Sequence, residues 1–377
     1  MIIGELSQLH PIHELPLHHW LSPPPPLKSA HMLTRTQLAE LLEEQDQPVY
    51  RTTQILDWIY KKRARSWEEM SNLPPALRAA LAEKYPLRPL THTLTKGSAD
   101  TTRKFLLELP DKRYIETVLI PASPALYGET SDRHTLCVSS QVGCAYACKF
   151  CASGLDGFTR NLTAAEIVSQ VILAEELSGE KVNNLVFMGM GEPLANFTNL
   201  CLALDMITSD WGLNIGARRI TVSTSGLVPQ IRKLAELPQQ IRLAISLHGS
   251  DDETREKIMP VNKKYPLDEL FDSLRLWNSK KNQKITLEYI LIDGVNADPE
   301  HAQILAKRAA SIRAKVNLIP YNTVEGLQWS RPSDEDCLRF KSVLTNANVS
   351  ATLRLEKGHD IDAACGQLRL KKEKAEI

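Results

Sequence analysis

The stretch from Cys137 to Cys151 reads Cys-Val-Ser-Ser-Gln-Val-Gly-Cys-Ala-Tyr-Ala-Cys-Lys-Phe-Cys, and its last three cysteines form a C-x3-C-x2-C pattern. Three thiolates at this spacing can each bind one iron of a cubane 4Fe–4S cluster, whereas an ordinary ferredoxin supplies four cysteines. The fourth iron is then left without a protein ligand, and an open metal position can bind a substrate. Cys144, Cys148 and Cys151 therefore predict a reactive iron–sulfur site, around which we expect the remaining chain to be organised.

Two other interpretations of the three cysteines stay open at this point. A structural zinc site needs a fourth ligand, and no nearby His or Cys completes a standard zinc spacing. The cysteines could also be inert core residues, because Cys often behaves as a small buried apolar residue.

The composition limits the class of protein. The chain has 377 residues, of which 43% are hydrophobic and 24% charged, as in an ordinary one- or two-domain globular protein. No apolar run is long enough to cross a bilayer, and the N-terminus lacks the layout of a signal peptide. Seven cysteines, four of them clustered, suit a reducing cytoplasm and a metal better than a disulfide scaffold. The formal net charge is zero, so binding to nucleic acid would require local basic patches.

Composition shifts divide the chain into four parts. Residues 1–31 are rich in His and Pro and predict a disordered tail. Metal binding by these histidines stays open, although their spacing is irregular. Residues 32–121 predict a small helical domain followed by a β hairpin. Residues 122–370 predict the main domain, and residues 371–377 a charged tail.

The helical part should begin at Thr34, because Thr34 and Gln37 form a capping box. Its second helix should end in a basic cluster made of Lys61, Lys62, Arg63 and Arg65. Such a cluster is ordinarily solvated and suits the end of a helix dipole, but it could also contact phosphates. In the β segment that follows, Glu116 interrupts an apolar strand, where a carboxylate usually faces water.

From residue 134 onward the pattern alternates between strands and helices, which favours a parallel sheet with helices outside. The predicted strands are His134–Ser139, Asn184–Met190, Arg219–Thr224, Ile241–His248, Ile285–Ile292 and Lys315–Pro320. The predicted helices are Ala164–Leu177, Thr198–Ile207, Val228–Leu237, Leu267–Asn278, Pro299–Ser311 and Ser333–Ala347. The pattern alone does not distinguish an open sheet from a barrel.

Unusual residues follow the carboxyl ends of these strands, where α/β barrels carry their chemistry. They are Cys144, the run Gly189-Met190-Gly191-Glu192-Pro193, the run Ser223-Thr224-Ser225-Gly226, the run Ser246-Leu247-His248, and Pro320-Tyr321-Asn322.

Taken together, these motifs resemble the RlmN/Cfr family of radical S-adenosylmethionine (radical SAM) RNA methyltransferases. The resemblance runs from about residue 35 to about residue 370 and includes Asp-Ile-Asp-Ala-Ala-Cys-Gly-Gln-Leu at the C-terminal end. It implies a partial (βα)6 radical SAM barrel, preceded by a small helical accessory domain and a short β linker.

The resemblance also implies roles for individual residues. Cys144, Cys148 and Cys151 would hold the 4Fe–4S cluster, Cys365 would carry the methyl group, Cys137 would be its disulfide partner, and Glu116 would be the proton acceptor. The expected contacts to SAM are Gly191, Glu192, Ser223, Ser246, Leu247, His248 and Asn322. Cys201 and Cys337 are expected to have no chemical role.

The implied reaction methylates carbon 2 of adenine 2503 in 23S rRNA and of adenine 37 in tRNA. It would use two molecules of SAM in a ping-pong mechanism through S-methylcysteine at Cys365, with an external one-electron reductant such as flavodoxin. We expect a cytoplasmic monomer that has no membrane partner.

Two rival functions remain at this stage. One is methylation of carbon 8 of the adenine, as in the Cfr resistance enzymes, and the other is a non-catalytic iron–sulfur RNA-binding protein. Two segments depart from the family pattern: Lys357-Gly358-His359-Asp360, where Arg often replaces Lys, and the loop from Thr323 to Trp329, where many carbon-2 enzymes are rich in Pro. Loops carry specificity, so the substrate depends on these departures more than the reaction does.

Overall fold

The computed structural model describes residues 34–122, 133–154, 157–322, 327–354, 359–361 and 368. The two expected tails and the expected methyl carrier, Cys365, lie outside the described residues. So do parts of both segments that depart from the family pattern, namely residues 323–326 and 357–358.

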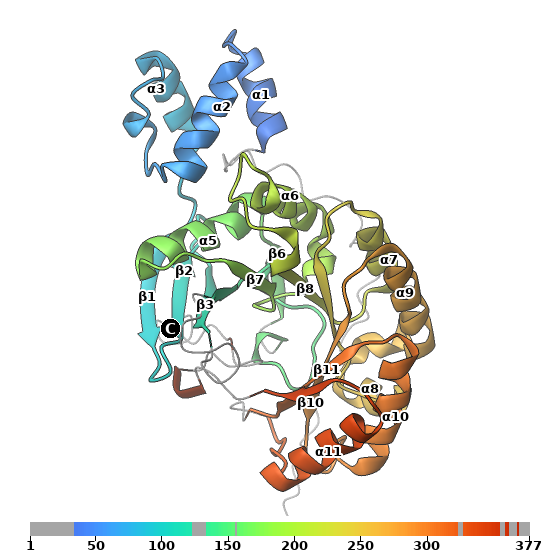
Figure 1. Cartoon of the computed structure of the whole chain (residues 1–377). Helices are drawn as coiled ribbons and strands as arrows, with labels where there is room; N and C mark the ends of the chain where they lie inside the picture. The colour runs from blue at the N-terminus through green and yellow to red at the C-terminus, as the bar shows by residue number, and fades with distance from the viewer. Residues whose placement is uncertain are drawn as a thin grey trace, which may run out of the picture.

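The N-terminal helices form a small unit that stands apart at the top of Figure 1. They are α1 (Arg35–Glu43), α2 (Tyr50–Leu56), which continues into a π-helical turn (Asp57–Lys61), and α3 (Pro75–Lys84). The predicted capping box is present, because the Thr34 side chain accepts from Gln37 N and the Gln37 side chain accepts from Thr34 N.

The described strands of the main sheet follow the order β1-β2-β3-β4-β7-β8-β9-β10-β11-β12. Pairing is antiparallel from β1 to β4 and parallel from β4 to β12. The strands are β1 (Thr91–Gly97), β2 (Arg103–Glu108), β3 (Tyr114–Pro121), β4 (His134–Cys137), β7 (Asn184–Phe187), β8 (Ile220–Thr224), β9 (Arg242–Ser246), β10 (Thr286–Leu291), β11 (Lys315–Pro320) and β12 (Ala351–Leu353). The six predicted parallel strands are confirmed, and the segment at residues 91–121 extends the same sheet.

Helices cover the convex side of this curved sheet in Figure 1. They are α5 (Ala164–Ser178), α6 (Phe197–Thr208), α7 (Val228–Glu236), α8 (Asp252–Ile258), α9 (Leu267–Lys280), α10 (Pro299–Ser311) and α11 (Asp334–Asn346). All six predicted helices are present. The prediction missed α8 and β12, because α8 opens with charged residues and β12 has only three residues.

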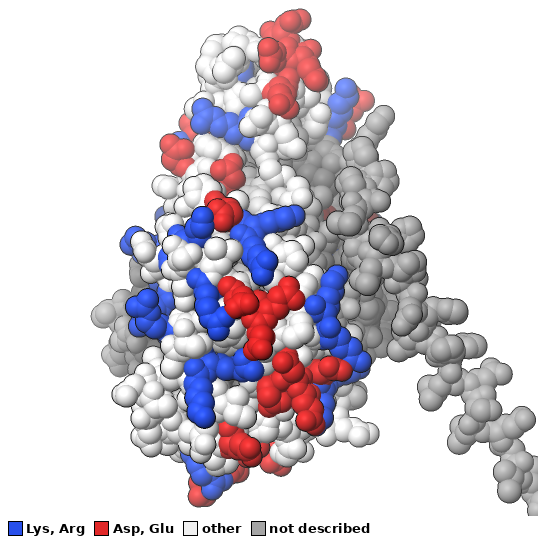
Figure 2. All heavy atoms as spheres, turned by 90° about the vertical axis from the view of Figure 1, so that its right-hand side faces the viewer, with Lys and Arg blue, Asp and Glu red and all other residues white. Residues whose placement is uncertain are grey.

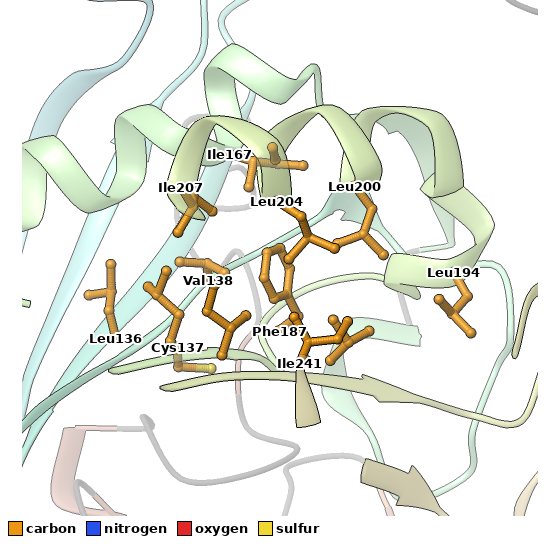
Figure 3. Packing of buried hydrophobic residues seen from close by; sticks show 14 of the residues in the cluster. Leu136, Cys137, Val138, Ile167, Phe187, Leu194, Leu200, Leu204, Ile207 and Ile241 are labelled. Atoms are coloured by element: carbon orange, nitrogen blue, oxygen red, sulfur yellow. The ribbon is translucent and has the colours of Figure 1, made fainter. Parts of the chain in front are cut away.

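The core between sheet and helices sets the direction of each strand side chain. Successive side chains of a strand point to opposite faces. In Figure 3, Leu136 of β4 and Val138, which directly follows that strand, pack toward helical residues such as Leu204 and Ile207, while the sulfur of Cys137 lies on the other side. The sequence Leu-Cys-Val therefore directs the thiol into the concave interior.

Ion pairs attach the helical unit to α5. Arg63 Nη2 lies 2.5 Å from Glu175 Oε2, and Arg88 Nη2 lies 2.6 Å from Glu176 Oε1. In the basic cluster, Lys61 pairs with Asp57 at 2.6 Å. Much of the cluster that could have contacted phosphates is thus engaged within the protein.

Candidate active site

The cysteine loop is held between two short strands that the sequence analysis did not predict. They are β5 (Gln141–Gly143) and β6 (Phe158–Asn161), which pair antiparallel. Cys144 N donates to Gly157 O at 2.8 Å, and Lys149 N donates to Ile258 O of α8 at 2.9 Å. Backbone hydrogen bonds therefore fix both the start and the middle of the loop.

The three cysteines line one cavity together with residues from the carboxyl-terminal parts of five neighbouring strands, β7 to β11. The cavity contains about 930 Å³ of space not filled by atoms, its open mouth included. Of the expected SAM contacts, its lining includes Gly191, Glu192, Ser223, Ser246 and His248. Leu247 and Asn322 are buried, but they do not line this cavity.

Gly191 and Glu192 form a tight turn after β7. Gly191 has φ +96°, and a Cβ there would stand 2.4 Å from Gln141 Cβ, so the position requires glycine. Glu192 is buried in the cavity wall, where Oε2 accepts from Ser225 N at 2.7 Å and Oε1 accepts from Leu194 N at 3.0 Å. Burial raises its pKa, although these hydrogen bonds oppose the shift. A carboxylate fixed in this way is suited to an ammonium group.

His248 is held in one tautomer. Ile290 N donates to its Nδ1 at 3.0 Å, so Nδ1 carries no proton and the neutral ring bears its proton on Nε2. The ring stacks edge-on against Phe150 with 4.5 Å between centroids. Burial lowers the pKa of His248 to about 3, so it lines the cavity as a neutral hydrogen-bond donor.

The cysteines fit a cluster better than a single metal ion. Among the described residues, no three His, Cys, Asp or Glu side chains stand close enough together to hold one ion. This finding argues against the zinc alternative. A cubane instead binds each thiolate through a different iron, so its ligands stand farther apart. Burial raises the pKa of Cys144 to about 12 and also raises the pKa of Cys148, and iron would supply the positive charge that buried thiolates need.

A buried cation lies next to the cysteine loop. Arg255 of α8 is fully buried and donates to Leu247 O, Asn262 Oδ1 and Ser225 O at 3.1, 2.8 and 2.6 Å. Burial lowers the pKa of Arg255 to about 10, and the nearby Cys148 partly opposes this shift. Arg255 thus joins the ends of β8 and β9 and places a positive charge beside the expected anionic cluster.

Cys137 and Glu116 lie on one face of the sheet, outside the lining of this cavity. Cys137 pairs with Val118 of β3, and Val118 pairs in turn with Lys104 of β2. Glu116 is two residues before Val118 and therefore points to the same side. The expectation that this carboxylate faces water is wrong: Glu116 Oε1 lies 3.0 Å from Lys104 Nζ, and both side chains are 7% exposed.

Described residues on both sides of Cys365 have defined contacts. Asp360 Oδ1 accepts from Ser98 Oγ at 2.6 Å, in the turn between β1 and β2. Leu368 O accepts from Ser153 Oγ at 2.8 Å, two residues after Cys151. Leu368 is thus held beside the cysteine loop.

Sequence reasoning missed three polar residues of this region: Lys104, Arg255 and Glu288. Glu288 of β10 lines the cavity and is 4% exposed. For Lys104 and Glu288, the only signal in the sequence was a charged residue inside an apolar strand, as at Glu116. Arg255 gave no signal, because it lies among other charged residues of a short helix.

The side of the molecule drawn in Figure 2 presents no single basic face among the described residues. Lys and Arg side chains are intermixed with Asp and Glu on the side shown in Figure 2. Salt bridges join neighbouring helices, for example Lys280 of α9 with Glu236 of α7 at 3.4 Å. Among the described residues, no helix is long and apolar enough to cross a membrane.

Comparison with known proteins identifies the class of this fold and site. The family model of the radical SAM superfamily matches residues 138–305. A solved structure described as a radical SAM methyltransferase from Sphaerobacter thermophilus superimposes with a TM-score of 0.84 at 43% identity, covering 92% of this chain and 99% of that one. The protein is therefore a radical SAM enzyme, and membership of that class implies SAM and a 4Fe–4S cluster as cofactors.

The particular family follows from the whole length of the chain. The ribosomal RNA large subunit methyltransferase N-terminal domain model matches residues 31–86. The probable dual-specificity RNA methyltransferase RlmN of Akkermansia muciniphila is 56% identical over 351 residues, which is 93% of this chain and 97% of that protein. A homologue from Opitutus terrae, probable dual-specificity RNA methyltransferase RlmN 3, is 54% identical over 90% of this chain and 94% of its own length. The chain belongs to the RlmN family of radical SAM RNA methyltransferases, as the sequence motifs predicted.

Proposed function

We propose that this protein methylates carbon 2 of adenine in RNA, at adenine 2503 of 23S rRNA and adenine 37 of tRNA. One observation carries the proposal: three cysteines at cluster spacing share a cavity with Glu192, Ser223 and His248, whose chemistry suits the polar groups of SAM. The N-terminal helices support an RNA substrate, because their family model is that of a ribosomal RNA methyltransferase.

Carbon 2 of adenine lies between two ring nitrogens and is too electron-poor to displace the methyl group of SAM directly. When bound, the cluster and SAM supply a one-electron reductive cleavage that yields a hydrogen-abstracting carbon radical. In the proposed ping-pong sequence, the Cys365 thiolate first takes a methyl group from one SAM, forming S-methylcysteine and S-adenosylhomocysteine. A second SAM, held in the cavity beside the cluster, would supply the radical that takes one hydrogen atom from this methyl group. The electron left over after the resulting methylene adds to carbon 2 would return to the cluster.

The remaining steps belong to residues of the sheet. Glu116 accepts the proton that leaves carbon 2, and its ion pair with Lys104 supports the ionised form of the carboxylate. The Cys137 thiolate attacks the Cys365 sulfur, which breaks the carbon–sulfur bond, and the released carbon takes up a proton to become the methyl group of the RNA. The product is a Cys137–Cys365 disulfide, which an external reductant must reduce before the next turnover. The one-electron donor to the cluster would be a protein such as flavodoxin.

The position of the carrier is supported by chain geometry. Cys365 is three residues before Leu368, whose carbonyl is bonded to Ser153 beside the cysteine loop. Three extended residues span at most about 11 Å. We place the enzyme in the cytoplasm as a monomer, where thiols stay reduced between turnovers.

The test is anaerobic reconstitution with iron, sulfide, SAM and an RNA fragment, followed by mass spectrometry of the nucleosides. We expect 2-methyladenosine from the wild type. Cys365→Ala and Cys137→Ala should form none, whereas the matched control Cys201→Ala should behave like the wild type. A product methylated on carbon 8 would instead support the Cfr-type activity. RNA binding without any methylated product, unchanged in Cys365→Ala, would support the non-catalytic alternative.

A further inference from the structure

Glu288 presents a carboxylate oxygen without a hydrogen-bond donor in the cavity, where the charge of Arg354 also acts on it. Its Oε1 accepts a hydrogen bond from Asn317 Nδ2 at 3.0 Å, which fixes the orientation of the side chain. Its Oε2 is buried and has no hydrogen-bond partner among the described residues. A buried carboxylate oxygen without a donor is costly, so native structures rarely keep one unless a ligand or water completes it.

The register of the sheet places Glu288 beside expected SAM contacts. Glu288 of β10 is directly opposite Ser246 of β9, so the two side chains share one face. The ring of His248 is fixed by Ile290 N, two residues further along β10. Glu288, Ser246 and His248 therefore form one wall of the cavity.

This wall is separated from Glu192 along the sheet, although His248 in it contacts Phe150 of the cysteine loop. Glu192 follows β7, and β10 is three strands away in the order β7-β8-β9-β10. Neighbouring strands are about 4.8 Å apart, so the separation along the sheet is about 14 Å. A ligand whose ammonium group binds Glu192 near the cysteines would extend its nucleoside toward Glu288.

We propose that Glu288 Oε2 accepts a hydrogen bond from a ribose hydroxyl of SAM. SAM has three kinds of nitrogen- or oxygen-bound hydrogen-bond donor: the ammonium group, the vicinal ribose hydroxyls and the adenine amino group. The ammonium is matched by Glu192, and the adenine amino group is a neutral donor on a single nitrogen. Vicinal hydroxyls offer donors on adjacent carbons, and an acidic side chain is the recurring partner of a nucleoside ribose in dinucleotide-binding folds. The assignment rests on the proposed function only in taking SAM as the ligand of this cavity.

The test measures binding and needs no RNA. Cluster-loaded protein is titrated anaerobically by equilibrium dialysis with SAM, 2′-deoxy-SAM and 3′-deoxy-SAM. Glu288→Gln keeps the shape of the side chain and removes its charge, and Glu335→Gln, exposed on α11, is the matched control. A hydrogen bond to a charged group corresponds to about a tenfold to hundredfold change in affinity. We expect Glu288→Gln to lose that factor for SAM, while the control loses nothing.

The deoxy analogues make the result specific. One analogue should bind the wild type at least about tenfold more weakly than SAM does, and it should bind Glu288→Gln and the wild type alike. Equal losses for SAM and both analogues, or SAM binding by Glu288→Gln that matches the wild type, would overturn the proposal. If Glu288→Gln fails to fold, wild-type protein that binds both analogues as tightly as SAM would overturn it too. Wild-type protein that holds its cluster but binds no SAM would instead refute the proposed function.

Discussion

Replacing Lys104 by Met should strongly destabilise the protein. Lys104 Nζ and Glu116 Oε1 are 3.0 Å apart, and each side chain is only 7% exposed, so the pair is largely removed from solvent. Removing one partner of a buried ion pair leaves an uncompensated charge and typically costs about 3–5 kcal/mol of unfolding free energy. The unfolding free energy of Lys104→Met should therefore be lower than that of the wild type by an amount in that range, which is a large fraction of the stability of an ordinary domain.

Chemical denaturation of the cluster-free protein, followed by circular dichroism under anaerobic conditions, would measure this loss. The double variant Lys104→Met/Glu116→Leu should recover most of it, because apolar groups of similar volume often replace a buried ion pair without a cost. The matched control is Lys257→Met, whose ion pair with Glu253 on α8 is exposed, with side chains 62% and 82% accessible. The reasoning fails if Lys104→Met is as stable as Lys257→Met, or if the double variant is less stable than the single one.

Three further predictions follow from the site and its support. Gly191→Ala should abolish SAM binding in equilibrium dialysis because its Cβ would clash with Gln141, whereas Gly216→Ala, with nothing within 4 Å, should bind normally. Burial lowers the pKa of His248 from 6.5 to about 3, so its contribution to stability is full above pH 6.5 and is lost as the pH falls toward 3. Acid titration followed by tryptophan fluorescence should therefore show a smaller loss of stability in His248→Gln than in the wild type. Arg88→Ala removes the ion pair with Glu176, so amide hydrogen exchange in residues 35–85 should become faster, and unchanged exchange would contradict the docking role.

Local patterns were enough to predict most of the fold. The alternation of apolar strands with amphipathic helices predicted six βα units, and Thr34 with Gln37 predicted the first helix cap. These features depend on neighbours within a few positions of the chain. The cysteine spacing and the Gly191-Glu192 turn are local in the same sense. Because both follow the carboxyl ends of parallel strands, the sequence also predicted that they would line one cavity.

Pairing between distant residues could not be predicted in this way. Lys104 meets Glu116, and Ser246 stands opposite Glu288, only because of the register between strands. Register depends on the packing of the whole sheet, and a shift by one residue would send each side chain to the opposite face. Arg255 shows the same limit for helices, since α8 has the charge pattern of a solvated helix although its arginine is fully buried.

The open sheet links the two parts of the proposed chemistry. β1 and β12 are at opposite ends of the strand order, yet Asp360, which follows β12, is bonded to Ser98 in the turn after β1. This hydrogen bond links the two ends of the strand order, and Leu368 is bonded to Ser153 beside the cysteine loop. Pairing of β1 with β12 would close the barrel, and the interior of a small closed barrel is filled by side chains. An open edge instead allows a chain segment and a flipped base to approach the same interior from one side, which a reaction with a carrier cysteine and an RNA substrate requires.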